Sequence, residues 1–466
     1  MRHDPLDTPA PDSAGVSRRA VLISGASAAA LVAAGGAFAL TRHHRDSVRI
    51  ATLADKPLYS TTVAFESLST RRLVDSPDEI VPGTRVAVDS LVRAELLARE
   101  QDWLASLAPW TRSSRNAELI SSAYLDMYVL SEGLDAPVAG WSSLWRHVWP
   151  RDSAHIAVAF AQAGFVDGAL RCLRFLARVP RNPRGWFEAR YDPDGRGVPD
   201  SRPAQFDGLG WTAWALGEVD RRLDWAAVPL ARSAFLTEFA PIITSVADTL
   251  NWTLTHYGTV PVSPDYWERR ESRLTLGTVA PTLAGLQALA PLLDDLGDAA
   301  RAASVRASAR RVEEIVREEF TQYGYPRLSR GDQLDAAVAF LLPPYVRGFD
   351  DEFGVRAALA RAWEALARPA GGIAPGEDWA ADGVSWTPET AVFALVESAF
   401  ADDVDGTSAE QEQAQQRAQT ALNWLGEHRT PAGSFSEKVL ADGSPAAVAP
   451  LAWTAACVAL AAYELG

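Results

Sequence analysis

The sequence predicts an all-α protein built as a closed ring of helix pairs, and three observations predict it. Apolar residues recur at helical spacing through most of the chain, most clearly over residues 236–250. About a dozen such segments follow one another between Asp89 and Gly466, whereas strand-like alternation is nearly absent. Long loops rich in Gly, Pro, Asp and Trp join the segments, which suits a helical toroid with a site at one end.

The first 45 residues read as a targeting segment rather than as part of this fold. Arg18 and Arg19 precede an apolar stretch, Ala20–Leu40, and the pattern resembles a twin-arginine export signal. Ala37-Phe38-Ala39 offers a cleavage site, but the stretch is also long enough to span a bilayer. We therefore expect an exported protein, either released or anchored to the membrane. No second apolar segment of spanning length is evident in the sequence, which predicts a soluble body.

Residues 46–88 mix Thr, Val, Pro and charges without helical period, and we interpret them as an extended lead-in. No internal linker is evident after Asp89, so residues 89–466 are predicted to form one domain. The net charge of -15 and the lack of a basic block argue against nucleic acid as the main partner. Cys172 and Cys457 lie in apolar helical patterns; they could pair, but two free buried thiols are the preferred interpretation.

The segment Trp145–Asp152 combines two tryptophans with an arginine and an aspartate where a loop becomes a helix. Pro150 fits the first turn of that helix, and Asp152 lies near its positive end. Aromatic rings beside fixed charges are what a site needs to stack a sugar face and to bind its hydroxyl groups. The alternative is a helix cap with a structural pair between Arg151 and Asp152.

Two further loops carry a candidate catalytic glutamate. Glu268 follows two large aromatic residues, Tyr266 and Trp267, and partial desolvation would keep such a carboxyl protonated, as a general acid requires. Glu437 precedes Lys438, whose charge would favour an ionised carboxylate, as a general base requires. Arg269 and Arg270, which follow Glu268, act against this protonation, and composition alone favours a surface charge cluster there. The Glu437 loop, taken alone, is also compatible with an ordinary pair of surface charges.

The sequence predicts neither a catalytic metal nor a cofactor. The seven histidines show no HExxH or clustered arrangement, and no Gly-rich phosphate loop follows a strand. Residues 192–197 resemble the start of a calcium loop but lack its later glutamate, so we interpret them as a tight turn.

Six short blocks, in this order and spacing, resemble glycoside hydrolase family 15, the glucoamylase family. The blocks are Val148–Asp152, Pro203–Gly208, Tyr266–Glu268, Leu334–Ala337, Gly371–Ile373 with Trp386, and Ser436–Lys438 followed by Pro450–Trp453. The resemblance implies an (α/α)6 barrel, a six-hairpin toroid, over most of residues 89–466. It also implies an enzyme that removes glucose from non-reducing ends with inversion.

The resemblance assigns roles to individual residues. It makes Glu268 the general acid and Glu437 the general base, with Glu271 and Glu389 as the nearest competitors for these roles. The residues that it places in sugar binding are Arg151, Asp152, Trp149, Gln205, Asp207, Trp267 and Trp386.

The chain departs from the family pattern at the walls of the expected pocket. Ser436-Glu437-Lys438 replaces the usual Pro-Glu-Gln, Ala374-Pro375 follows Gly371–Ile373 instead of Arg-Tyr, and Thr454-Ala455 replaces a histidine often found after Trp453. These changes keep both glutamates but unsettle which sugar and linkage are selected. The preceding β-sandwich of many bacterial members and a starch-binding module are not recognisable.

The predicted function is therefore that of an exported, inverting exo-glycosidase that acts on α-glucosidic bonds of oligosaccharides or of a cell-envelope glycan. Trehalase-like activity and action on another sugar are the alternatives within this class. The alternative from another class is a helical toroid that binds glycans without catalysis. The presence of both Glu268 and Glu437 favours the enzyme.

Overall fold

The computed structural model describes residues 58–198, 200, 202–228, 230–401 and 409–466. All of them belong to one compact unit, Ala54–Gly466. Residues 1–57 lie outside the described residues, so the signal or anchor predicted at 1–45 stays a prediction.

Helices dominate the described part of the chain. The α-helices are α2 (Arg93–Ser106), α3 (Trp110–Ser113), α4 (Ala117–Ser131), α5 (Pro150–Gln162), α6 (Val166–Arg178), α7 (Asp207–Arg222), α8 (Arg232–Tyr257), α9 (Leu276–Asp295), α10 (Ala299–Glu319), α11 (Glu352–Ala365), α12 (Thr387–Ala401), α13 (Ala409–Glu427) and α14 (Ala452–Glu464). The 3₁₀ segments are η1 (Pro77–Glu79), η2 (Thr321–Tyr323) and η3 (Ala336–Leu341).

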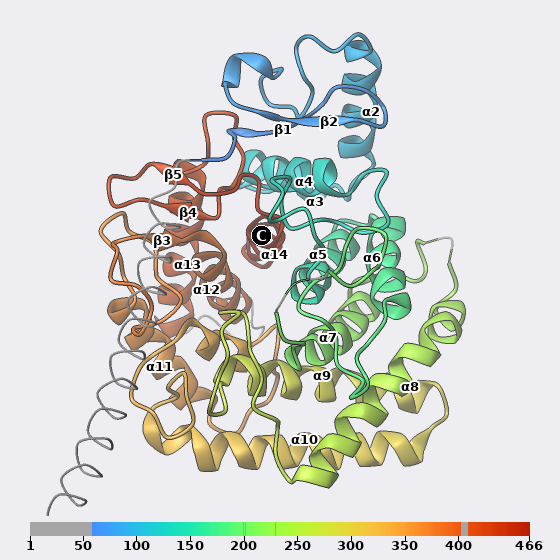
Figure 1. Cartoon of the computed structure of the whole chain (residues 1–466), viewed down its shortest axis with the longest axis vertical. Helices are drawn as coiled ribbons and strands as arrows, with labels where there is room; N and C mark the ends of the chain where they lie inside the picture. The colour runs from blue at the N-terminus through green and yellow to red at the C-terminus, as the bar shows by residue number, and fades with distance from the viewer. Residues whose placement is uncertain (1–57, 199, 201, 229, 402–408) are drawn as a thin grey trace, which may run out of the picture. The chain divides into compact units, whose positions relative to one another are not determined.

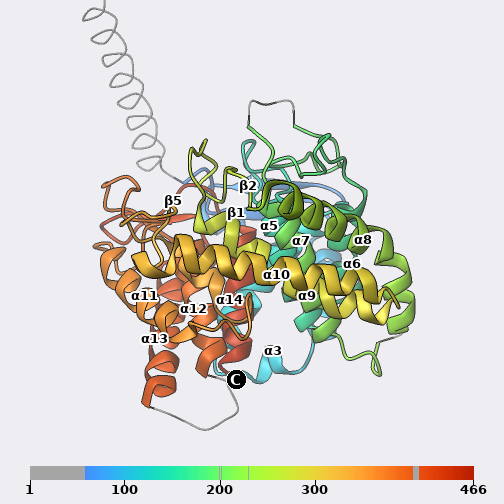
Figure 2. The ribbon, with the colours of Figure 1, turned by 90° about the horizontal axis from the view of Figure 1, so that it is seen from below.

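From α4 onward, the main elements alternate between an outer and an inner layer of a ring (Figures 1 and 2). The inner elements are α5, α7, α9, η3, α12 and α14, and each contacts the next until α14 meets α5. The outer helices are α4, α6, α8, α10, α11 and α13. This is an (α/α)6 toroid in which one inner position is a short 3₁₀ segment, and it confirms the predicted fold class.

The alternation of outer and inner helices determines at which end of the ring the loops before the inner helices meet. Because each outer helix runs back along its inner neighbour, all inner elements point the same way and their N-terminal ends open at one end of the ring. Backbone N–H groups at these ends are unpaired within their own helices, and the helix dipoles are positive there. Carboxylates and polar ligands are favoured at this end of the toroid.

The inner helices are apolar on most sides because neighbours cover them. Helices α7 and α9 approach closely through glycines: a Cβ atom at Gly210 would lie 2.2 Å from the carbonyl oxygen of Pro281. Helix α9 also has the length and hydropathy of a membrane span, which the sequence analysis overlooked, yet 83% of that window is buried inside the protein. The described helix is therefore a core helix.

An aromatic cluster fills the centre of the ring. The ring of His155 packs against Trp211, Trp214, Tyr345 and Trp453 at centroid distances of 4.9–5.7 Å. Burial lowers the pKa of His155 to about 3, so the imidazole is neutral and contacts the Arg151 carbonyl and the Tyr345 hydroxyl. The cluster fills the interior of the ring between the inner elements.

Short strands lie outside the ring. In the lead-in, β1 (Thr62–Phe65) pairs antiparallel with β2 (Arg71–Val74), and β1 packs on α4. A second sheet has the order β3 (Ser385–Trp386), β4 (Lys438–Val439) and β5 (Pro445–Ala446), all antiparallel. It joins the loop before α12 to the loop before α14.

Candidate active site

The residues predicted to bind or cleave a sugar lie at the N-terminal ends of the inner elements. Each of five inner elements carries at least one: Arg151 and Asp152 begin α5, Asp207 begins α7, Glu268 precedes α9, Trp386 precedes α12 and Glu437 precedes α14. Segments far apart in the sequence thus meet at one end of the ring.

One loop touches both candidate catalytic glutamates. The indole N–H of Trp145 donates a hydrogen bond to Glu437 Oε1 at 3.2 Å. The indole N–H of Trp149, at the N-cap of α5, donates to Glu268 Oε1. Because these tryptophans are four residues apart, the loop brings Glu268 and Glu437 to the same site.

The backbone at Glu268 adopts a conformation that is uncommon for residues with a side chain. Its φ is 55°, in the left-handed region, where a non-glycine residue is held only by its surroundings. Asp265 provides that constraint, since its carbonyl accepts from the Glu268 N–H at 2.8 Å and its carboxylate from the Trp267 N–H at 3.0 Å. The turn aims Glu268 at Trp149.

A buried arginine, Arg327, stabilises this turn. Arg327 forms a two-pronged ion pair with Asp265, at 2.7 and 3.1 Å, and its guanidinium lies 3.7 Å from the ring centroid of Trp267. Arg327 also forms an ion pair with Glu271 at 2.5 Å. Glu271, the competitor for the acid role, is therefore already bound to a cation. Trp267 meets Trp379 edge to face at 4.7 Å, so the predicted aromatic wall extends to a second indole.

A second arginine contacts Glu268 directly and was missed by the sequence analysis. Arg202 pairs with Glu268 Oε2, and its guanidinium lies 5.8 Å from the ring centroid of Trp149. Arg269, which follows Glu268 directly in the sequence, stacks over Trp379 at 4.3 Å. Arg202 comes from a segment 66 residues earlier in the chain, and no local pattern links it to Glu268.

The loop that carries Glu437 is anchored on both sides. Asp126 accepts hydrogen bonds from the Ser434 hydroxyl at 2.7 Å and from the Phe435 N–H at 2.9 Å. Asp126 is itself buried in an ion pair with Arg85 of the lead-in, at 2.7 Å. The Glu437 carbonyl accepts from the Thr387 N–H, which ties the loop to the start of α12.

Lys438 lies beside both Glu437 and Trp386. Its ammonium nitrogen is 3.7 Å from Glu437 Oε2 and 4.2 Å from the ring centroid of Trp386, its partner in the β3–β4 register. An adjacent cation favours the ionised form of a carboxylate. This is the charge arrangement that the sequence analysis expected for a general base.

Arg151 and Asp152 form a buried pair at 2.8 Å, and the Arg151 guanidinium lies 4.2 Å from the ring centroid of Trp453. Burial raises the pKa of Asp152, while the charge of Arg151 opposes the rise. Two nitrogens of Arg151, Nε and Nη1, have no hydrogen-bond partner among the described residues. Arg151 can therefore donate further hydrogen bonds to a ligand, which a purely structural cap would not need.

Gln205 and Asp207 are buried near these groups. No described hydrogen bond joins either of them to the carboxyl group of Glu268 or Glu437. The Gln205 side chain donates to the Asp265 carbonyl at 3.4 Å, and Asp207 accepts from the Trp211 indole at 3.3 Å. Burial raises the pKa of Asp207 to about 7, with Asp265 adding to the rise and Arg151 opposing it. Gln205 therefore contacts the acid loop, which is the segment from Asp265 to Glu268. Contact of Gln205 or Asp207 with a sugar stays a prediction.

Several buried polar atoms around this end of the ring have no hydrogen-bond partner among the described residues. Besides the two nitrogens of Arg151, such atoms among the described residues include the indole nitrogens of Trp267, Trp379, Trp386 and Trp453 and a carboxyl oxygen each of Asp335, Glu389 and Glu437. Leaving a buried polar group unpaired costs about 1–3 kcal/mol, so proteins keep few of them. A ligand rich in hydroxyl groups would satisfy these donors and acceptors.

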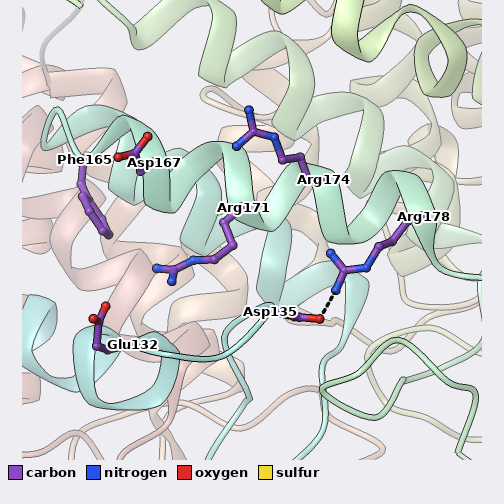
Figure 3. A pocket seen from close by; sticks show the side chains of 7 residues that line it. All are labelled: Glu132, Asp135, Phe165, Asp167, Arg171, Arg174 and Arg178. Carbon is purple, nitrogen blue, oxygen red and sulfur yellow. Dashed lines mark hydrogen bonds and ion pairs between the residues drawn. The ribbon is translucent and has the colours of Figure 1, made fainter. Parts of the chain in front are cut away.

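A separate hollow of about 460 Å³ contains none of the predicted site residues (Figure 3). Arg171, Arg174 and Arg178 of α6 line it, with Arg178 paired to Asp135 at 2.6 Å.

The two cysteines, Cys172 and Cys457, are free and buried, which confirms the preferred interpretation. Within the described ranges, no group of three His, Cys, Asp or Glu side chains is arranged to hold a metal ion.

The fold is shared with solved glycosidases of the glucoamylase type, as the sequence blocks predicted. A wild-type glycosidase structure is 19% identical over 75% of this chain and 96% of its own, with a TM-score of 0.61. A bacterial glucoamylase in complex with acarbose is 17% identical over 80% of this chain, with a TM-score of 0.63. This chain spans 59% of that glucoamylase's length.

A third solved structure has a similar fold. The glucoamylase from Saccharomycopsis fibuligera is 15% identical over 76% of this chain and 96% of its own, with a TM-score of 0.59. No protein-family model and no curated protein sequence matches the chain. At these identities the likeness establishes the glucoamylase-type (α/α)6 fold, and the activity has to be argued from the site.

Proposed function

We propose that the protein is an exported glycoside hydrolase that removes a sugar unit from the non-reducing end of an α-glucosidic oligosaccharide or envelope glycan, with inversion. The observation that carries this proposal is the pair of indole hydrogen bonds from Trp145 and Trp149, which unite Glu437 and Glu268 at one site. The bound acarbose named for the bacterial glucoamylase is consistent with a carbohydrate ligand at this type of fold.

In the proposed reaction, Glu268 gives its proton to the glycosidic oxygen as the bond from that oxygen to C1 breaks. Glu437 takes a proton from a water molecule whose oxygen attacks C1 from the opposite face. The products are the free sugar of inverted configuration and the shortened chain. Room for this water requires the two carboxyl groups to be roughly 6.5–9.5 Å apart.

Arg202 is relevant to the non-catalytic alternative. A guanidinium paired with a carboxylate favours the ionised form, whereas the acid role needs a protonated Glu268. The catalytic proposal therefore requires that the substrate displace Arg202 from Glu268. A protein that only binds glycans would keep the ion pair.

The deciding experiment is a screen of reducing-sugar release against maltose, isomaltose, trehalose, dextran and envelope polysaccharides. Release of sugar from at least one α-linked substrate is expected, with trehalose distinguishing a trehalase-like enzyme. Binding of these sugars without any release would favour the non-catalytic toroid.

Asp152→Asn is expected to lower kcat/KM by about 10²-fold, since a site built to hydrogen-bond a hydroxyl group loses discrimination when one charged partner goes. The asparagine keeps the size of the side chain and an acceptor for Arg151. Kinetics and thermal unfolding of the same preparation check this, with Asp192→Asn, which removes the charge beside His147, as the control. A drop in Tm with unchanged kcat/KM in the folded fraction would instead make Asp152 a structural cap.

Export through the twin-arginine route is part of the proposal and rests on the sequence alone. Replacing Arg18 and Arg19 by lysine together is expected to retain the protein in the cytoplasm, because the paired arginines define the signal. Cell fractionation and immunoblotting measure this. Normal export of the double variant would contradict the route, and the apparent size of the exported wild-type chain separates cleavage from anchoring.

A further inference from the structure

Glu389 is a third carboxyl group at the open end of the ring, and the reaction proposed above does not use it. It lies in the first turn of α12, three residues after Trp386, and is 4% exposed. Its Oε2 atom has no hydrogen-bond partner among the described residues. A carboxyl oxygen that is buried and unpaired is costly unless something else satisfies it.

The charged and titratable groups around Glu389 come from several different elements. Those whose charges act on it, or that respond to it, are Arg151 of α5, Tyr266 of the acid loop, Asp335 before η3, Glu437 of the base loop and Cys457 of α14. Arg151 Nε and Nη1 also have no hydrogen-bond partner among the described residues, and neither has Glu437 Oε2, which lies 3.7 Å from the Lys438 ammonium. Glu389 thus belongs to the cluster of unsatisfied donors and acceptors described above.

These surroundings favour the uncharged form of Glu389. Burial raises its pKa to about 8, the charges of Glu437 and Asp335 add to the rise, and Arg151 and the residue's own backbone N–H oppose it. A neutral carboxylic acid can donate through its O–H as well as accept, unlike a carboxylate. Apolar burial can keep an acid neutral at pH 7 so that it donates a hydrogen bond.

We propose that Glu389 is a specificity-determining residue of the proposed sugar site, whose buried carboxyl group exchanges hydrogen bonds with a hydroxyl group of the bound sugar. The inference rests on the proposed function. A sugar hydroxyl both donates and accepts, which matches a neutral acid. An ionised Glu389 would instead stand beside the negative Glu437 and could only accept. The substrate class that this favours is a neutral, hydroxyl-bearing sugar.

Two variants separate hydrogen bonding from bulk. Glu389→Gln keeps a neutral donor and acceptor, and kcat/KM for maltose at pH 7 should stay within about 10-fold of wild type. Glu389→Leu removes both, and kcat/KM should fall by about 10²-fold. Glu397→Gln is the matched control: Glu397 is equally buried in α12 but pairs with Arg417 at 2.6 Å, so its loss should lower Tm without changing kcat/KM.

Maltose analogues that lack one hydroxyl group on the non-reducing ring provide a readout that a structural role would not move. For wild type, one analogue should be cleaved much more slowly than maltose, and Glu389→Leu should lose that preference selectively. If Glu389→Leu keeps both its rate and its preference, the inference is wrong although the proposed function stands. If wild type cleaves nothing but binds maltose, and Glu389→Leu binds it more weakly, the proposed function is wrong and the inference stands.

The protonation state has its own test, independent of activity. Between pH 4.5 and about 8, folded Glu389 keeps a proton that the unfolded chain has lost, so its contribution to stability falls as pH rises through this window. Glu389→Gln lacks this contribution. Its Tm, relative to wild type, should therefore rise steadily from pH 5 to pH 8. A constant difference in Tm across this window would show that Glu389 is ionised, and would overturn the proposal.

Discussion

Glu268→Gln is expected to lower kcat on an α-linked disaccharide by about 10³-fold, since general acid catalysis contributes roughly 10²–10⁴-fold. The amide fills the same space and can still bond the Trp149 indole, but it has no proton to give to the glycosidic oxygen. Substrate should still bind, so KM is expected to change far less than kcat. Steady-state kinetics on purified, folded protein measure both.

The leaving group distinguishes an acid from any other role. In an α-glycosyl fluoride the leaving group is fluoride ion, which departs without being protonated. Glu268→Gln should therefore retain most of its rate on that substrate. Glu271→Gln is the matched control from the same loop, because Glu271 is committed to Arg327 and should not affect the leaving group. Equal losses on the fluoride and on the disaccharide would remove Glu268 from the acid role.

The ring of helices could be predicted because its causes are local. Apolar stripes at helical spacing, as over residues 236–250, define each helix, and the loops between them define the pairing. The short inner segment η3 could not be predicted this way, because Ala336–Leu341 is apolar throughout and carries no period. Helix α9 shows the converse: its span-like hydropathy is a property of the sequence and was overlooked, whereas its burial depends on its neighbours in the fold.

The candidate site was predicted only where its residues share a short block. Glu268 lies beside Trp267 in sequence, and Glu437 beside Lys438, so each carries its own pattern. Arg202, Arg327 and Asp126 act on those loops from segments 59 or more residues away, and only the folded ring brings them there. Trp145 was noticed as an aromatic residue, but its hydrogen bond to Glu437 needs the two loops to meet.

Glu389 shows a different limit. The sequence analysis treated it only as a competitor for the catalytic roles, because a glutamate in a helix start is usually a solvated cap. Its neutral state follows from burial and from two neighbouring carboxyl groups that belong to other loops. A shift of this kind is a property of the assembled pocket.

Glu437→Gln is expected to lower kcat by a similar factor, about 10³-fold, but on the disaccharide and on the α-glycosyl fluoride alike. The reason is that both substrates need an activated water, and an amide cannot take its proton. The Trp145 indole and Lys438 would still hold the side chain in place, so the loss should not come from disorder of the loop. Kinetics on both substrates, beside those of Glu268→Gln, separate the two glutamates.

The configuration of the product decides whether Glu437 is a base or a nucleophile. A base that activates water on the face opposite the leaving group gives a β-anomer first from an α-linked substrate. Glu437→Ala leaves space for a small anion, and azide should restore turnover of the α-glycosyl fluoride as the β-glycosyl azide. NMR of the first-formed sugar from wild type and of the azide product measures both configurations. An initial α-anomer from wild type would mean retention through a covalent intermediate, and Glu437 would then be the nucleophile instead of the base.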